Sequence, residues 1–529
     1  LFDSLPAGAA FLSICALAMM GGGSFFLART AGVSRPLAFV AAVAMGTNAH
    51  VFYWYASSWI PGLLAFAFLP WAMAFLLRAL EGRWSYLAAG LFTALTATAG
   101  WPMAVLALGV FVVAICAVRL TQGGWREVFA PASAAFFGVL MAMPAIGPML
   151  ATGAVTIRPM GISNAENMLV PALGDVLALS HPFHQGWMRI FGNYSPVSSP
   201  LFYVAWFILP VLVLLDWRKV RWGAQNLIIL LAFAALMLLA SQGPSHLGPL
   251  RWPFRYLVYF DLAVICAVPL LLSQAGLVPS ARRLFIALGA VGLSGILALQ
   301  SDPGHAAGIM LATAVLLALA GTLWLLRRAP AGRMAAFLVL TTAGFILTLH
   351  AVTPRNGNVP DWQFLQAPVR TVSLIPAPKA STFVLSGLGD TGRPERFNEI
   401  LFGQMGLVRG AATVNGYSPI GHKGLSAFFC FSTHGTPCPE AGPRLFQREP
   451  ETGATFADLM RIDRIVAQRG LYLQKVEPFL SVPWHRDHAG TYALDFTRPL
   501  PNGTLPGTVS FPVDGMGLQG EGAARATFE

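Results

Sequence analysis

The chain has 529 residues, of which 56% are hydrophobic and only 11% are charged, and this balance excludes an ordinary soluble globular protein. The formal net charge is +11, but the basic residues stand at the ends of apolar runs rather than in one stripe, so nucleic-acid binding is not expected. The apolar runs are about 17–25 residues long, the length that crosses a hydrocarbon core of about 30 Å. The sequence therefore predicts a multi-pass membrane protein.

Lys and Arg gather in short loops at every second gap between these runs. Because loops rich in Lys and Arg face the cytoplasm, the pattern predicts the orientation of about twelve transmembrane helices. Residues 1–352 are then a transmembrane domain, and residues 353–529 an external soluble domain. The six basic loops contain Arg29 and Arg35; Arg78 and Arg83; Arg119 and Arg126; Arg218, Lys219 and Arg221; Arg282 and Arg283; and Arg327, Arg328 and Arg333.

The chain begins with Leu rather than Met, and no charged leader with a cleavage site precedes the first apolar run, so we expect a longer natural protein. The second run returns outward and ends in an aromatic turn, residues 48–55, which contains Asn48, His50 and Tyr55. Such a turn is either an aromatic belt at the membrane interface or a surface for a sugar or headgroup. These three residues are therefore candidate substrate contacts.

A long external connection, residues 151–200, follows the sixth run, and loops of about fifty residues are usually functional. Its candidates for substrate contact are Arg158, Glu166, His181 and His184. Glu166 also completes a capping box with Ser163, so it serves either function or a helix start. The two histidines flank Pro182 without an obvious third ligand, which favours substrate contact over a metal site.

Apolar residues recur at helical spacing from Val170 to Leu177 in this connection. The spacing predicts a short helix on the external membrane surface.

The segment Leu250-Arg251-Trp252-Pro253-Phe254-Arg255-Tyr256 lies on the external side by the same span count. Its two arginines violate the charge bias of external loops. Two guanidiniums among aromatic rings suit an anionic group, most simply a lipid-linked phosphate. The alternative is an aromatic belt with arginines reaching toward headgroups. Asp261, in the next apolar run, is either functional or paired with a neighbouring helix.

The composition changes near Ala351, and no later run could cross a membrane. Short strand-like pieces and a helix near Phe456 predict an α+β or mostly β external domain. Cys430 and Cys438 should form a disulfide there, because two thiols with His434 fall short of a structural zinc set. Tyr417, in an Asn-Gly-Tyr sequence, offers a flat face for a sugar ring, although a plain β-turn through Asn-Gly is the alternative.

The order of these features resembles the YfhO-like bacterial membrane proteins, which belong to the GT-C class of polytopic glycosyltransferases. The likeness covers most of the chain and rests on Gly23–Leu37, Trp59–Pro61, Arg251–Tyr256, Val414–Pro419 and Asp458–Val466. It implies an α-helical, GT-C-like membrane domain and a polyprenyl-phosphate sugar bound at the outer membrane face. It also implies an acidic catalytic residue on the first large external loop. Here that residue would precede Leu1, with Asp3 as the remnant of its loop.

The resemblance thus implies transfer of a sugar to an envelope polymer or lipid acceptor at the bacterial inner membrane, with the C-terminal domain outside. Arg251 and Arg255 would hold the donor phosphate. No cofactor is firmly expected, and a requirement for Mg or Mn stays open. The alternatives are a transporter or flippase of a lipid-linked glycan, although no convincing internal repeat supports it, and an assembly protein whose external domain only binds glycan.

Overall fold

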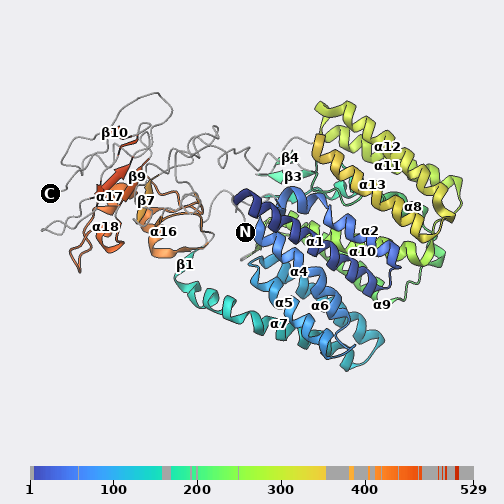
Figure 1. The fold of residues 1–529 in the computed structure, drawn as a ribbon, viewed down its shortest axis with the longest axis horizontal. Helices are drawn as coiled ribbons and strands as arrows, with labels where there is room; N and C mark the ends of the chain where they lie inside the picture. Colours follow the sequence, from blue (N-terminus) through green and yellow to red (C-terminus); the bar gives the residue numbers. More distant parts are fainter. Residues whose placement is uncertain are drawn as a thin grey trace. The chain divides into compact units, whose positions relative to one another are not determined.

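The chain divides into two compact units, Leu1–Pro148 with Asn164–Val359, and Met149–Ser163 with Pro360–Glu529. The predicted boundary was residue 352, and the beginning of the predicted external connection groups instead with the C-terminal unit. A computed structural model (Figure 1) describes residues 5–56, 59–157, 168–190, 193–197, 200–247, 250–352, 381–385, 403–404, 412–418, 420–438, 440–462, 464–467, 486–487, 491–492, 495–496 and 507–510.

The first unit, hereafter the membrane unit, is a bundle of helices. Eight helical segments among the described residues are long and apolar enough to cross a membrane, and two further apolar helices are shorter. The chain is therefore an α-helical multi-pass membrane protein, as predicted. In chain order the helices are α1 (Leu5–Ala31), α2 (Arg35–Gly46), α4 (Ile60–Leu77), α5 (Arg83–Thr98), α6 (Pro102–Gln122), α7 (Trp125–Ala151), α8 (Ile208–Leu214), α9 (Gln225–Ala240), α10 (Leu257–Ala275), α11 (Ala281–Ser301), α12 (Ala306–Leu325) and α13 (Ala331–Val352).

Each predicted run contains one of these helices, but the seventh run, Leu201–Leu215, is helical only in α8. Residues before α8 form turns whose backbone groups bond elsewhere. The Val204 amide donates to the Leu179 carbonyl, and within the first turn of α8 the Leu209 amide donates to the Ser180 hydroxyl. This stretch is therefore tied to the external connection rather than extended as a full membrane span.

Helix α10 occupies the middle of the bundle. In the most apolar stretch of α10, 89% of the residues are buried inside the protein, compared with 33% for α1 and 17% for α7. Helix α10 packs against α1, α2, α8 and α9. A helix that is apolar all round belongs in such a central position. Helix α1 approaches α4 through Gly23, where a Cβ atom would lie 2.7 Å from Trp71 Cδ1, so a larger residue would separate the two helices.

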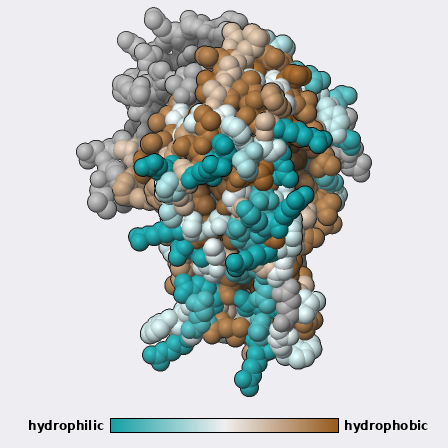
Figure 2. All heavy atoms as spheres, turned by 90° about the vertical axis from the view of Figure 1, so that its right-hand side faces the viewer, coloured by the Kyte–Doolittle hydropathy of each residue, from teal (hydrophilic) through white to brown (hydrophobic). Residues whose placement is uncertain are grey.

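The short basic loops all join helices at one end of the bundle, because successive helices run in opposite directions. Figure 2 looks onto the right-hand end of Figure 1 and shows hydrophilic side chains gathered on that face, with hydrophobic residues around and behind them. Strands β3 (Trp187–Ile190) and β4 (Asn193–Pro196) of the external connection lie at the other end of α11, α12 and α13 (Figure 1).

The external connection contains a small antiparallel sheet with the strand order β2-β3-β4. Its strands are β2 (Val170–Pro171), β3 (Trp187–Ile190) and β4 (Asn193–Pro196). The surface helix predicted from Val170 is wrong at its start, because Val170 pairs with Arg189 of β3. Only the 3₁₀ helix η4 (Leu173–Ala178) forms, with Asp175 buried and Leu173 exposed.

The C-terminal unit is α+β. Its four-stranded sheet has the order β12-β13-β9-β7, in which β7, β9 and β13 are parallel and β12 is antiparallel. The predicted helix near Phe456 is present as α18, which leads into β9. The elements of the sheet are β7 (Thr382–Leu385), β9 (Arg464–Ala467), β12 (Asp495–Phe496) and β13 (Gly507–Ser510), and the helices are α16 (Lys423–Phe429), α17 (Ala441–Leu445) and α18 (Phe456–Leu459).

The described residues of this unit also form two short strand pairs. Strand β1 (Thr156–Ile157), which follows α7, pairs with β8 (Gly421–His422), and β10 (Arg486–Asp487) pairs with β11 (Thr491–Tyr492). The expected disulfide between Cys430 and Cys438 is present.

The orientation of the bundle can be tested with two exposed positions at opposite ends. The side chains of Lys219 and His305 are 69% and 60% exposed, and the charge bias places Lys219 inside and His305 outside. In a variant without Cys15, Cys116 and Cys266, we expect a membrane-impermeant maleimide to label His305→Cys in intact cells. Lys219→Cys should react only after permeabilisation. Labelling of Lys219→Cys in intact cells would show that the predicted orientation is wrong.

Candidate functional site

The segment with the two unexpected arginines leads directly into the central helix. Strand β6 (Leu250–Arg251) pairs with β5 (His246–Leu247), and the 3₁₀ helix η6 (Pro253–Tyr256) continues into α10. Between them Trp252 has a left-handed backbone with φ of 64°, a conformation that costs a bulky residue on the order of 1–3 kcal/mol. The surrounding fold holds this strained residue in place, and its amide donates to the Ser245 carbonyl.

Three tryptophan rings surround the guanidinium of Arg255. Its Cζ atom lies 4.1 Å from the ring centroid of Trp252, 4.7 Å from that of Trp101 and 5.0 Å from that of Trp59. Arg255 is only 2% exposed, and cation–π attraction is strongest with Trp and in desolvated sites. The Arg251 guanidinium lies 4.9 Å from the same Trp252 ring. We call these five residues the Arg–Trp cluster.

Trp59 and Trp101 were not predicted from the sequence to belong to this cluster. Each of the three tryptophans immediately precedes a helix with Pro in its first two positions: Trp59 before α4, Trp101 before α6 and Trp252 before η6. Proline is favoured at a helix start because its missing N–H is not needed there. A tryptophan followed by proline within two residues, repeated at external helix starts, was the available signal.

His50 and Tyr55 form a buried layer next to the cluster. The His50 ring stacks between Tyr55 and Phe254, with centroid distances of 5.6 and 5.5 Å, and both His50 and Tyr55 are fully buried. Tyr55 also meets the edge of Trp101 at 5.3 Å. Gly62 permits this packing, because a Cβ atom there would overlap the Tyr55 ring.

The aromatic turn is therefore packed inside the protein and is neither an exposed belt nor an open surface. Val51–Tyr55 forms a single π-helical turn, a local geometry that is frequent at functional sites. In this structure the turn supports the Arg–Trp cluster, and direct contact of His50 or Tyr55 with a substrate stays a prediction.

Asp261 pairs with a polar group on a neighbouring helix, one of its two expected roles. The Asn48 amide nitrogen, just beyond α2, donates to Asp261 Oδ2 of α10 at 3.0 Å, and Asn48 Oδ1 accepts from the Val51 amide at 3.1 Å. Both side chains are buried. Asn48 thus joins the end of α2 to the central helix, and its predicted contact with a substrate remains untested.

His181 and His184 form hydrogen bonds that hold the external connection in place within the membrane unit. His181 Nδ1 accepts from the Phe183 amide at 3.3 Å, so its Nε2 carries the proton and donates to Thr313 Oγ1 of α12 at 3.1 Å. Burial, with a smaller effect of His184, lowers the pKa of His181 to about 3. Both ring nitrogens of this neutral histidine are therefore used within the protein.

His184 belongs to a second buried network. Its Nε2 lies 2.9 Å from Asp175 Oδ1, while Asp175 Oδ2 accepts from the Trp187 amide at 2.7 Å. Gln185 extends the network to α11, because its amide donates to Ser301 Oγ at 3.2 Å. Within the described residues, no group of three or more His, Cys, Asp or Glu side chains could hold a metal ion.

The remaining predicted site residues lie elsewhere. Asp3, Arg158 and Glu166 fall outside the described residues. Tyr417 belongs to the C-terminal unit, where its ring lies 5.6 Å from that of His434 and its carbonyl accepts from Gln404 Nε2 at 2.7 Å.

Comparison with known proteins identifies no family. No protein-family model matches the chain, and no curated protein sequence matches it significantly. Two crystal structures of ArnT from Cupriavidus metallidurans show a partial likeness, each at 14% identity. The apo form has a TM-score of 0.43 over 72% of this chain and 68% of that chain, and the form bound to undecaprenyl phosphate has 0.45 over 77% and 75%. Similarity at this level assigns no function, and the resemblance to YfhO-like proteins stays a prediction.

The buried Asn48–Asp261 pair should contribute to stability. Asn48→Ala removes the amide donor from a buried carboxyl group, which costs about 1–3 kcal/mol, so we expect a lower melting temperature in detergent. Replacing both residues, as in Asn48→Leu with Asp261→Leu, should recover much of the loss, because neither polar group is then left alone. Asn226→Ala, which loses one bond to the Thr30 carbonyl, is the matched control. A double variant whose loss of stability equals the sum of the losses in Asn48→Leu alone and Asp261→Leu alone would contradict the pairing.

The lowered pKa of His181 makes unfolding depend on pH. Between about 3 and 6.5 the unfolded chain binds a proton at this position more readily than the folded chain. The free energy of unfolding therefore decreases as the pH falls below 6.5, by at most about 1.4 kcal/mol per pH unit. We expect the melting temperature of His181→Gln to fall less than that of the wild type between about pH 7 and about pH 4.5. Exposed His246→Gln should behave as the wild type, and equal slopes for all three would refute the effect.

Proposed function

We propose that the chain is a membrane glycosyltransferase in which Arg251 and Arg255 bind the phosphate of a polyprenyl-phosphate sugar. The acceptor is an envelope polymer or lipid on the external face of the bacterial inner membrane. The supporting observation is the Arg–Trp cluster: two guanidiniums packed on tryptophan rings at the end of the bundle opposite the basic loops. The proposal also places the C-terminal unit outside the cell.

The geometry of the cluster suits a phosphate. A guanidinium stacked against a ring keeps its N–H groups in its own plane, where they can form paired bonds with phosphate oxygens. Arg255 is buried, and the low polarity of such surroundings strengthens its attraction for an anion. The start of α10 directly after η6 adds the positive end of a helix dipole.

The location of the cluster favours an anion carried by a lipid. The segment lies between α9 and α10, at the end of the bundle where the span count places external headgroups. A lipid-linked phosphate would reach this depth with its chain in the hydrocarbon layer. A soluble nucleotide sugar would approach from water. Its phosphates would not require arginines at the level of the lipid headgroups.

The proposed reaction is an inverting transfer. An acceptor hydroxyl attacks C1 of the sugar, the bond from C1 to the phosphate oxygen breaks, and the polyprenyl phosphate departs with the bonding electrons. The two guanidiniums stabilise the negative charge that grows on this leaving phosphate. A carboxylate takes the proton of the acceptor hydroxyl, and Asp3 is the candidate that we name for that role.

Substituting the arginines tests the proposal. In nanodiscs, Arg251→Ala with Arg255→Ala should weaken binding of undecaprenyl phosphate by at least about a hundredfold, since each charge-assisted contact contributes about 1.5–3 kcal/mol. Native mass spectrometry measures the binding, and a labelled polyprenyl-phosphate sugar measures transfer. Arg255→Lys should give an intermediate loss, because it keeps the charge but not the planar fork.

The matched control is Arg189→Ala. Arg189 is another arginine of the membrane unit and lies over the Tyr194 ring at 5.3 Å, so its removal should leave binding unchanged. Equal transfer by the wild type and the double variant would refute the phosphate site. Binding of a lipid-linked glycan without transfer, but with movement across the bilayer, would favour a transporter. Assays with added Mg²⁺, added Mn²⁺ or a chelator decide the metal requirement.

A further inference from the structure

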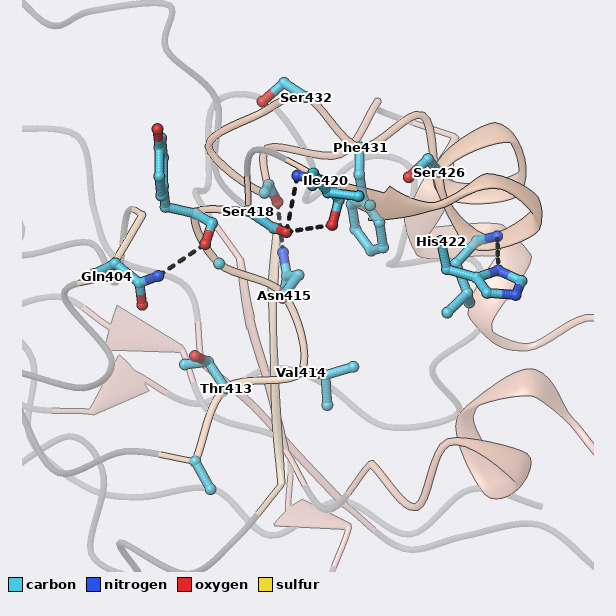
Figure 3. A pocket seen from close by; sticks show the side chains of 16 residues that line it. Gln404, Thr413, Val414, Asn415, Ser418, Ile420, His422, Ser426, Phe431 and Ser432 are labelled. Carbon is cyan, nitrogen blue, oxygen red and sulfur yellow. Dashed lines mark hydrogen bonds between the residues drawn. The ribbon is translucent and has the colours of Figure 1, made fainter. Parts of the chain in front are cut away.

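The C-terminal unit contains a cavity of about 440 Å³, within the range of about 300–1,000 Å³ that small-molecule sites occupy. Figure 3 shows Asn415 and Ser418 between Gln404 on one side and His422 and Ser426 on the other. Among the described residues that line the cavity, none is Asp, Glu, Lys or Arg. This described lining has no Asp, Glu, Lys or Arg side chain that could act as a counter-ion to a phosphate, a carboxylate or a metal cation.

Specific contacts hold the walls of the cavity in place. The Asn415 side chain donates to the carbonyls of Val384 and Gly435 and accepts from the Val384 amide, each at 2.7 Å. It therefore joins three backbone segments, and neither N–H of its amide is left for a sugar. The disulfide between Cys430 and Cys438 closes the loop that contains Gly435. A site with such fixed walls binds without a large ordering cost.

Several polar groups at the cavity can exchange hydrogen bonds with a ligand. Ser432 Oγ accepts from the His434 and Thr436 amides, both at 3.2 Å, which leaves its hydroxyl hydrogen as a donor. His422 Nδ1 accepts from the Leu425 amide at 3.3 Å, so the neutral ring carries its proton on Nε2. Gln404 donates through Nε2 to the Tyr417 carbonyl, and its Oε1 is an acceptor.

The cavity also has hydroxyl and aromatic walls. Ser426, Thr413 and Ser418 add hydroxyl groups, while Phe431 and Tyr417 contribute aromatic rings. Neutral donors and acceptors together with aromatic residues match a pyranose ring, which has hydroxyls on its edge and C–H groups on its faces.

We propose that this cavity binds a neutral sugar unit of the acceptor glycan. Its identity as the acceptor rests on the proposed glycosyltransferase function, whereas its preference for uncharged sugars follows from the lining alone. The cavity takes one or two hexose or N-acetylhexosamine units and discriminates against uronic acids and phosphorylated sugars. Recognition of charge is thereby confined to the Arg–Trp cluster, and recognition of the neutral glycan to the C-terminal unit.

The full-length protein in nanodiscs provides the test. Its binding to neutral hexose and N-acetylhexosamine oligosaccharides, and to matched hexuronate oligosaccharides, is measured by saturation-transfer difference NMR. We expect the wild type to bind neutral members only. Ser426→Trp fills the cavity and should weaken binding by at least about tenfold. Ala427→Trp, at the next and exposed position of α16, does not line the cavity and should bind as the wild type.

A second, smaller substitution keeps the test valid if Ser426→Trp fails to fold. Thr413→Val keeps the side-chain shape but removes one hydroxyl, and should weaken binding about 2- to 10-fold, the effect of one hydrogen bond. The proposal is overturned if no neutral sugar binds the wild type, if hexuronates bind equally well, or if all variants bind alike. Undecaprenyl phosphate binding in the same nanodiscs separates the two proposals. Donor binding without sugar binding refutes only the cavity, and sugar binding without donor binding refutes only the phosphate site.

Discussion

The membrane unit depends on how a charged guanidinium is accommodated at the edge of a membrane. Burying a charge costs several kcal/mol unless nearby groups compensate it. Around Arg255 three tryptophan faces contribute to this compensation. Because each of these tryptophans stands immediately before a different helix, the same contacts join the N-terminal ends of α4, α6 and η6. The left-handed backbone of Trp252 is the local cost of bringing one indole between two arginines.

The aromatic residues that pack against the Arg–Trp cluster explain how the Arg255 guanidinium can be held rigidly. His50 is stacked between Tyr55 and Phe254, and aromatic rings restrict one another with little loss of side-chain freedom. The Asn48–Asp261 bond fixes the same turn to α10 about one helical turn from the start of that helix. A phosphate site built on these helices would be preorganised, which catalysis through electrostatic stabilisation requires.

The two units differ in the chemistry they present. The membrane unit combines two guanidiniums with aromatic rings, whereas the cavity of the C-terminal unit has neutral polar groups and aromatic rings. A sugar transferase needs both kinds of recognition, because its leaving group is a phosphate and its acceptor is a hydroxyl. The external connection has a structural role at these positions, because the ring nitrogens of His181 and His184 form hydrogen bonds within the protein.

The local pattern of the sequence determined the helices and predicts their orientation, because hydropathy and charge bias act over a single span. It also located Arg251 and Arg255 as an exception to that bias. Only the tertiary structure decided that Trp59, Trp101 and Trp252 meet, because residues so far apart in the chain are brought together by helix packing. The same packing buried Asn48, His50 and Tyr55. Their sequence shows an aromatic turn, but whether a turn faces lipid, water or protein depends on the helices that surround it.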